Sequence, residues 1–147
     1  MKLLLVDDHE MVRLGLKSYL SMQDGIDQVL EASDGQEGVE IALQERPDVI
    51  IMDIVMPHMT GIEATLAILK EWSDAKILIL TSYLDNEKIY PVLDAGAKGY
   101  MLKTSSAEEI LRAIRKVEQG ELAIETEVSQ KVEYRKNHVE LHDDLTA

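Results

Sequence analysis

The stretch DVIIMDIVMPHMTG, residues 48–61, sets a pattern that the rest of the chain repeats. Four apolar residues, Val49–Met52, stand directly before an acid, Asp53, and the loop that follows is marked by Pro57 and Gly61. A short apolar run bounded by turn signals is typical of a strand buried on both faces, because a half-exposed strand alternates apolar and polar residues. The stretch therefore predicts a central strand that ends in a carboxylate.

Other short apolar runs share this character and alternate with segments of helical periodicity. The expected strands are Leu3–Val6, Gln28–Glu31, Val49–Met52, Ile77–Leu80 and Tyr100–Leu102. Five strands that alternate with five helices indicate an α/β protein with a doubly wound, five-stranded parallel sheet and helices on both faces. In such sheets ligands bind beyond the carboxyl ends of the strands, so the residues that close the strands are the candidates for function.

The helices are expected from their caps and apolar faces. Three pairs have the spacing of a capping box: Ser33 with Gln36, Thr60 with Glu63, and Ser106 with Glu109. The residues expected to face the core are Val12, Leu16, Tyr19, Leu20, Val39, Ala42, Leu43, Ile62, Leu66, Leu69, Ile110, Leu111, Ile114 and Val117. Gly96 suits the end of a helix over 86–95, Pro91 is expected to kink or shorten that helix, and Gly120 stops the last one.

Composition narrows the class of protein. The 147 residues suit one domain with a short tail, and the net charge is −13, from 15 basic and 28 acidic residues. Without a basic stripe the chain is not expected to hold DNA by itself. The absence of Cys excludes disulfides and thiolate metal sites. No apolar run has the roughly 18 residues of a membrane span or the form of a secretory signal, so we expect a cytoplasmic protein with no membrane partner.

Polar residues close four of the expected strands: Asp7 and Asp8 the first, Asp53 the third, Thr81 the fourth and Lys103 the fifth. In a doubly wound sheet these ends converge, and three carboxylates there would repel one another unless a cation or protons intervened. A few oxygen ligands with room for water suit Mg²⁺. A carboxylate can then act as a nucleophile and form an aspartyl phosphate, while a hydroxyl and an ammonium group bind the phosphoryl oxygens.

Each of these residues also has an ordinary explanation when taken alone. Asp7 or Asp8 could cap a helix, and Thr81 and Lys103 could be a strand-end residue and a solvated lysine. His9 has no His or Cys partner, so it is expected not to be a metal ligand. The coincidence of four strands that each end in a group needed by one reaction favours the shared function.

Separated segments of the chain resemble the receiver domains of two-component response regulators. They are LLVDDHEMVRLG, DVIIMDIVMPHMTGIEA, ILILTS and AGAKGYMLKT, and the resemblance covers residues 1–120. The segments DDHEMVRLG and KTSSAEEIL are similar to the NarL/LuxR subgroup and, within it, to the LiaR/VraR cell-envelope stress regulators. The resemblance implies a flavodoxin-like or CheY-like (βα)5 fold.

The resemblance also implies a role for each acidic residue. Asp53 would accept phosphate from the phosphohistidine of a sensor histidine kinase, and the protein would be no enzyme beyond its own phosphorylation and dephosphorylation. Asp8 and Asp53 would ligate Mg²⁺ directly, with Mn²⁺ as the alternative ion. The backbone carbonyl of Val55 would complete the protein ligands, and Asp7 would act through water.

The remaining site residues would bind the phosphate and transmit the switch. Thr81 would bind a phosphoryl oxygen and move toward it, Lys103 would pair with the phosphate, and Tyr100 would rotate inward as Thr81 moves. Ser82 is small, as the resemblance requires beside the phosphate.

Three positions depart from the most familiar pattern. Thr104 stands where many receivers have a proline after a cis peptide, so the isomer of the Lys103–Thr104 peptide is left open. Val55 and Tyr83 occupy positions that tune phosphate lifetime in the resembling family. Because the side chain of Val55 cannot orient a hydrolytic water, slow self-dephosphorylation is expected.

Residues 121–147 are expected to form a linker helix and tail that lead toward a helix-turn-helix DNA-binding domain. That domain is absent from this sequence, and we expect a truncated chain rather than a naturally short one. Phosphorylation would drive homodimerisation, which would pair two DNA-binding domains. The face made by the first and fifth helices and the face made by the fourth helix, fifth strand and fifth helix remain alternative dimer surfaces.

Other classes fit less well. An aspartyl-nucleophile phosphohydrolase of the haloacid dehalogenase type needs an acid where Val55 stands, and a flavin carrier needs a Ser/Thr/Gly-rich loop after the first strand. A receiver-like module that is never phosphorylated would not require Asp8, Asp53, Thr81 and Lys103 together.

Overall fold

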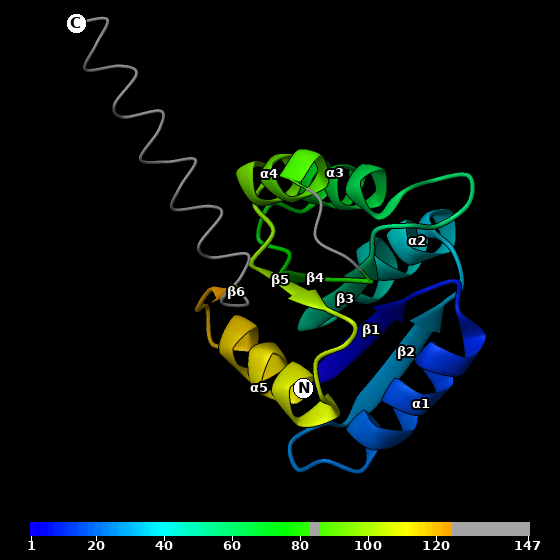
Figure 1. Cartoon of the computed structure of the whole chain (residues 1–147), viewed down its shortest axis with the longest axis vertical. Coiled ribbons are helices and arrows are strands. Elements are labelled where there is room, and N and C mark those ends of the chain that lie inside the picture. Colours follow the sequence, from blue (N-terminus) through cyan, green and yellow to red (C-terminus); the bar gives the residue numbers. More distant parts are fainter. Residues whose placement is uncertain (83–85, 125–147) are drawn as a thin grey trace, which may run out of the picture.

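The computed structural model describes residues 1–82 and 86–124, which form a central sheet covered by helices (Figure 1). The strands are β1 (Lys2–Val6), β2 (Gln28–Ala32), β3 (Val49–Asp53), β4 (Ile77–Thr81), β5 (Gly99–Leu102) and β6 (Ala123–Ile124). The helices are α1 (Glu10–Ser21), α2 (Gly35–Glu45), α3 (Gly61–Glu71), α4 (Asn86–Ala95) and α5 (Ala107–Glu118). Tyr83 lies outside the described residues.

All strands of the sheet are parallel and lie in the order β2-β1-β3-β4-β5-β6. The chain passes from β1 outward to β2 and then returns across β1 to β3, so the direction of winding reverses between β1 and β3. This confirms the predicted doubly wound parallel sheet. Ligands of such sheets bind where the winding reverses, which is at the carboxyl ends of β1 and β3.

The sheet has one strand more than the five that were predicted. Ala123 and Ile124, which were expected in a linker helix, pair with Gly99 and Tyr100 of β5. A Cβ atom at Gly99 would lie 2.7 Å from the carbonyl oxygen of Ala123, so the missing side chain allows β6 to approach. The remainder of the predicted linker, 125–147, lies outside the described residues.

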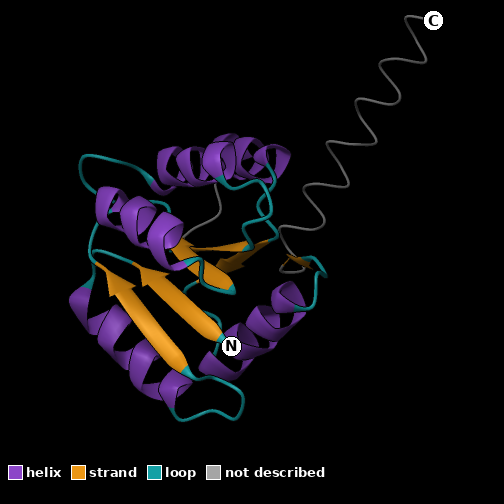
Figure 2. Cartoon of the chain, turned by 180° about the vertical axis from the view of Figure 1, so that it is seen from behind, coloured by secondary structure: helices purple, strands orange, loops and turns teal. Residues whose placement is uncertain are grey.

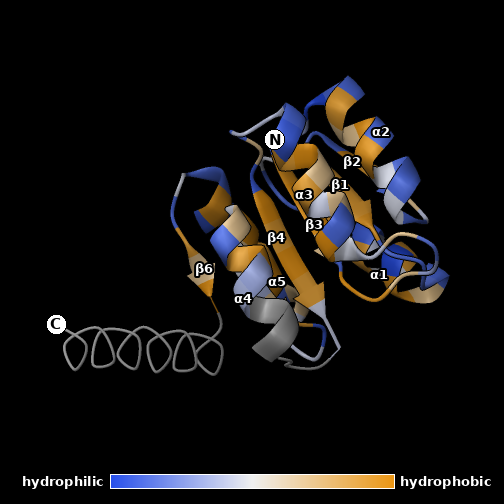
Figure 3. Ribbon diagram, turned by 90° about the horizontal axis from the view of Figure 1, so that it is seen from above, coloured by the Kyte–Doolittle hydropathy of each residue, from blue (hydrophilic) through white to orange (hydrophobic). Residues whose placement is uncertain are grey.

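Alternate residues of the central strands face two separate cores. Leu4 and Ile50 pack with residues of α2, α3 and α4, whereas Leu3 and Ile51 pack with residues of α1 and α5. Figures 1 and 2 show these two groups of helices on opposite faces of the sheet. Figure 3 shows the strands as the most continuously apolar elements. Since both faces are covered, β3 and β4 are buried along their whole length.

The buried helix faces differ from the prediction at two places. Leu66 is 47% exposed and Val12 is 41% exposed, although both were expected to face the core. Helix α3 instead buries Ala64, Thr65 and Ile68, a face rotated by roughly a third of a turn from the predicted one. The helix packs against α2 and α4 as well as the sheet, and small residues allow this close approach.

None of the described helices is long and apolar enough to cross a bilayer.

The predicted helix caps are partly confirmed. Thr60 and Glu63 form the reciprocal capping box. The box predicted at Ser33 and Gln36 is wrong, because Asp34 is the cap of α2 and accepts the N–H of Glu37 at 2.8 Å.

The cap of α5 has only half of the predicted box. Ser106 accepts the backbone N–H of Glu109, whose carboxylate accepts from the Ser106 hydroxyl rather than from its backbone.

The ends of α4 and α5 agree with the sequence. Gly96 (φ +115°) and Gly120 (φ +90°) follow the two helices in left-handed backbone, which glycine adopts without a steric penalty. Pro91 lies inside α4, which nevertheless keeps its predicted bounds. No cis peptide occurs in the described segments, so Lys103–Thr104 is trans.

Two glycine-to-alanine substitutions should have opposite effects on stability. A Cβ atom at Gly61 would lie 1.9 Å from the carbonyl oxygen of Asp53, whereas one at Gly15 would meet nothing within 4 Å. Gly61→Ala should therefore lower the free energy of unfolding by about 3 kcal/mol. Gly15→Ala should raise it by about 0.5–1 kcal/mol, because alanine loses less backbone entropy in a helix. Urea denaturation measures both, and equal effects would contradict the packing described for Gly61.

Candidate functional site

The acidic residues of the strand ends meet where the winding of the sheet reverses. Asp53 is the last residue of β3, and Asp7 follows β1, which pairs with β3 through Val6 and Met52. The backbone N–H of Asp7 donates to the carbonyl oxygen of Ala32 at 3.1 Å, which continues the β1–β2 ladder by one residue. Parallel pairing thus places the two carboxylates at one edge of the sheet, as the sequence predicted.

Lys103 joins these carboxylates from the end of β5. Its Nζ is 2.8 Å from Asp7 Oδ2 and 3.2 Å from Asp53 Oδ2, and only 11% of its side chain is exposed. The backbone N–H of Lys103 donates to the carbonyl oxygen of Thr81 at 2.6 Å, which ties its position to the end of β4. The ordinary explanation of a solvated lysine is therefore wrong.

Asp53 carries an unfavourable charge in this setting. Its side chain is 3% exposed. Burial raises the pKa of the carboxyl group, the negative charges of Asp7 and Asp8 raise it further, and the ammonium group of Lys103 opposes them by lowering it. The net direction is upward, so the site would bind a cation or a proton favourably.

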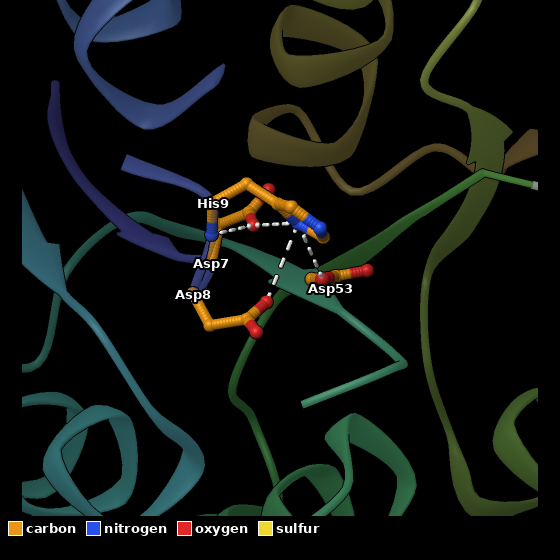
Figure 4. A group of neighbouring side chains, drawn as sticks. All are labelled: Asp7, Asp8, His9 and Asp53. Atoms are coloured by element: carbon orange, nitrogen blue, oxygen red, sulfur yellow. Dashed lines mark hydrogen bonds and ion pairs between the residues drawn. The ribbon is translucent and has the colours of Figure 1, made fainter. Parts of the chain in front are cut away.

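His9 lies inside the same cluster, which the sequence did not lead us to expect. Its Nδ1 is 3.0 Å from Asp7 Oδ1, 3.3 Å from Asp8 Oδ1 and 3.8 Å from Asp53 Oδ2 (Figure 4). The signal available in the sequence was only its position directly after two acids. One ligand atom from each of these four residues lies within 4.8 Å of the others.

A second network holds the loop that carries the acids. Arg13 of α1 donates from Nη1 to the backbone carbonyl of Asp7 at 2.6 Å and pairs through Nε with Glu31 of β2 at 3.1 Å. Lys17 pairs with the same glutamate at 2.9 Å. The hydrogen bond from Lys17, followed by that from Arg13, outweighs desolvation and lowers the pKa of Glu31. The network thus links α1 and β2 to the backbone of the site.

The other predicted site residues border this cluster. Thr81 ends β4 and is 2% exposed. Tyr100 is fully buried within the core that α2, α3 and α4 cover. Val55 follows β3 and is 46% exposed. Among the described residues, no hydrogen bond joins the Thr81 hydroxyl to these carboxylates, so its predicted role stays a prediction.

The donor set fits a hard divalent cation. Asp7, Asp8 and Asp53 supply carboxylate oxygens, which Mg²⁺ and Mn²⁺ prefer. The 30% exposure of the Asp8 side chain leaves the cluster open to solvent, and Mg²⁺ keeps several waters when bound to proteins.

The sequence has clear relatives. The family model of the response regulator receiver domain matches residues 3–115. The chain is 53% identical to transcriptional regulatory protein LiaR of Bacillus subtilis (strain 168), over 93% of this chain and 65% of LiaR. It is 46% identical to response regulator protein VraR of Staphylococcus aureus (strain Mu3), over 99% of this chain and 70% of VraR. The chain thus spans 65% of the length of one relative and 70% of the other.

Solved structures share the fold. A two-component response regulator of the LuxR family from Aurantimonas sp. SI85-9A1 gives a TM-score of 0.85 at 32% identity, covering 92% of this chain and 96% of that one. A CheY-like receiver domain protein from Methanospirillum hungatei JF-1 gives 0.76 at 26% identity, over 81% and 94%. These similarities confirm the predicted family, its LuxR-type subgroup and the CheY-like fold.

The raised pKa of Asp53 predicts how stability depends on pH. A group whose pKa is higher in the folded than in the unfolded chain contributes stability below its unfolded pKa, and that contribution is lost as pH rises through the folded value. At pH 7 without divalent cations, Asp53→Asn should therefore raise the melting temperature. The gain should shrink as the pH approaches the ordinary carboxyl range.

The matched control is Asp74→Asn, since Asp74 is exposed in the turn before β4 and surface changes usually stay within about 0.5 kcal/mol. Mg²⁺ should stabilise the parent protein more than Asp53→Asn. A lower melting temperature for Asp53→Asn than for the parent in metal-free buffer would contradict the assignment of an unfavourable charge to Asp53.

Proposed function

Because the chain belongs to the response regulator receiver domain family, we propose that Asp53 accepts a phosphoryl group from the phosphohistidine of a sensor histidine kinase. One observation carries the proposal: a buried carboxylate stands among two other acids and one lysine at the switch point of the sheet. A carboxylate with a purely structural role would be expected to have a compensating cation and no excess of like charge around it. Here Lys103 is shared between Asp7 and Asp53, and a bound cation would balance the negative charge that remains.

The transfer itself needs one nucleophile and an aligned phosphate. A carboxylate oxygen of Asp53 forms a bond to phosphorus as the bond between phosphorus and the histidine nitrogen of the kinase breaks, and the histidine nitrogen keeps that electron pair. Asp8, Asp53 and the backbone carbonyl of Val55 would hold Mg²⁺ or Mn²⁺, with Asp7 acting through water. When bound, the ion supplies charge neutralisation for the incoming phosphate.

The neighbouring polar side chains complete the reaction centre. The ammonium group of Lys103 already contacts Asp53 at 3.2 Å, so a short movement would pair it with a phosphoryl oxygen. Thr81 ends the adjacent strand β4, and its hydroxyl would donate to another oxygen. Phosphoryl transfer depends mainly on such positioning and charge compensation, and the protein needs no further catalytic group.

Phosphorylation would act by shifting a conformational balance. Thr81 would move toward the phosphate, and Tyr100, whose side chain is fully buried here, would hold the inward position in the active arrangement. A shift from 1:99 to 99:1 requires about 5.5 kcal/mol of differential affinity. The readout would be homodimerisation.

The biological setting follows from the relatives. LiaR is named as a transcriptional regulatory protein and VraR as a response regulator, and this chain would likewise regulate transcription, in cell-envelope stress as the sequence resemblance implies. The receiver domain predicted over 1–120 would extend to Ile124, because β6 joins the sheet, and the linker would follow it. DNA would be bound through a separate output domain. The protein would work in the cytoplasm, with the sensor histidine kinase as its partner and no enzymatic activity on other substrates.

Acetyl phosphate tests the acceptor directly. Incubation with acetyl phosphate and Mg²⁺ should add a single phosphoryl group of about 80 Da to the intact mass, with release of acetate. Asp53→Ala should abolish the adduct, Lys103→Ala should reduce its yield, and the control Asp74→Ala should leave it unchanged. Gel filtration of the same samples should show a dimer only where the adduct forms.

The outcomes separate the proposal from its rivals. An adduct that survives in Asp53→Ala would place the acceptor elsewhere. No adduct in the parent protein would leave a receiver-like interaction module that is never phosphorylated. An adduct without a change in oligomeric state would support Asp53 as the phosphoryl acceptor but refute dimerisation as the consequence of phosphorylation.

The phosphorylated protein should lose its phosphate slowly. Val55 is 46% exposed beside the site, but its side chain offers no hydrogen bond that could orient an attacking water. Val55→Asn should shorten the lifetime of the phosphorylated form, and Val55→Ile serves as an apolar control with the parent lifetime. Intact mass measured over time after removal of acetyl phosphate gives the rates. A half-life of seconds in the parent protein would refute slow hydrolysis.

A further inference from the structure

His9 occupies a helix cap without capping the helix. It is the N-cap residue of α1, a position at which Ser, Thr, Asp or Asn would accept a backbone N–H, but its side chain makes no capping hydrogen bond. The ring turns toward the carboxylates of Asp7, Asp8 and Asp53 instead (Figure 4). A residue that gives up a local stabilising interaction is expected where function requires its side chain.

The spacing of the ring nitrogen and the carboxylates matches that of ligands around one ion. Two atoms bound side by side to an ion at about 2.1 Å lie about 3.0 Å apart, and two atoms bound on opposite sides lie about 4.2 Å apart. The Nδ1 atom of His9 is 3.0, 3.3 and 3.8 Å from oxygens of Asp7, Asp8 and Asp53. All three separations fall within that interval.

The Nδ1 atom of His9 has two kinds of polar neighbour. Asp7 Oδ1, at 3.0 Å, accepts a hydrogen bond from Nδ1 when that nitrogen carries a proton, whereas the ammonium Nζ of Lys103, at 3.3 Å, can donate to Nδ1 only when it does not. A metal ion bound among the carboxylates would displace the Nδ1 proton, because metal ligands must be deprotonated. Nδ1 would then offer its electron pair to the ion.

We propose that His9 Nδ1 is an additional protein ligand of the cation site, which makes the site selective for zinc and similar transition metal ions over Mg²⁺. The inference rests on the proposed function, because Asp8 and Asp53 serve both ions. Imidazole nitrogen suits Zn²⁺, whereas Mg²⁺ takes oxygen ligands. Zinc held in this way would engage an oxygen of Asp53 and compete with the magnesium-dependent phosphorylation.

Titration of the full chain with zinc chloride and with magnesium chloride tests the selectivity. His138 and His142 are replaced by asparagine in every sample, because they could bind zinc independently. In that background His9→Asn keeps a carbonyl oxygen near the position of Nδ1 but removes the nitrogen ligand. His58→Asn is the matched control, since His58 is exposed outside the cluster and its positive φ of 70° is one that asparagine tolerates.

His9→Asn should weaken zinc binding by about tenfold or more and change magnesium binding by less than about twofold. His58→Asn should change neither. Long-range ¹H–¹⁵N spectra of the histidine rings should show one Nδ1 resonance that moves with zinc and is missing in His9→Asn. Such a signal reports ligation directly and does not depend on phosphorylation.

The failures are distinguishable. Zinc affinity that stays within about twofold in His9→Asn, with magnesium binding and the phosphoryl adduct intact, would overturn the role of His9 and leave the proposed function standing. Absence of both magnesium binding and the adduct in the parent background would overturn the proposed function and this inference with it.

Discussion

The buried charge of Asp53 is the constraint on which the rest of the structure depends. A carboxylate that is 3% exposed is costly unless a cation or a proton compensates it. The sheet increases the repulsion at Asp53, because pairing of β1 with β3 brings the Asp7 carboxylate to the same edge. The sheet also positions a compensating positive charge, because Lys103 follows β5 and contacts both carboxylates. Helices on both faces exclude water from the strands below, which increases the cost of the charge and therefore the affinity for a cation.

The fold could be predicted because its main signal lies in short runs of the sequence itself. Strands covered on both faces must be apolar throughout, so the runs in β3 and β4 identify a parallel sheet without any knowledge of contacts. Details that depend on neighbours could not be predicted. The buried face of α3 is set by its packing against α2 and α4, which left Leu66 outside. The two-residue β6 carries too little pattern to distinguish it from a linker. Asp34, a residue type that caps helices as well as serine does, occupies the cap position that was predicted for Ser33.

The site could be predicted to the extent that strand ends determine it. Parallel strands share their carboxyl edge, so Asp7, Asp53 and Lys103 had to meet once their strands were identified. The position of His9 inside the acidic cluster was not expected, because only His or Cys neighbours were considered for it, whereas its neighbours are carboxylates. The Arg13–Glu31 pair was not anticipated either, since it depends on how α1 lies against β2. Both misses concern side-chain direction, which sequence spacing does not specify.

Lys103 would connect the charge of the site to the proposed conformational switch. Its ammonium group is shared between Asp7 and Asp53, while its backbone N–H is bound to the carbonyl of Thr81. New negative charge on Asp53 would draw the ammonium away from Asp7, and that movement would act on the ends of β4 and β5 together. Tyr100 lies three residues before Lys103 on β5, inside the core shared with α3 and α4. A change in charge at Asp53 would thus be transmitted by Lys103 to the packed side chain of Tyr100. Because a packed core has discrete arrangements rather than a continuum of them, such a change would favour one arrangement over another.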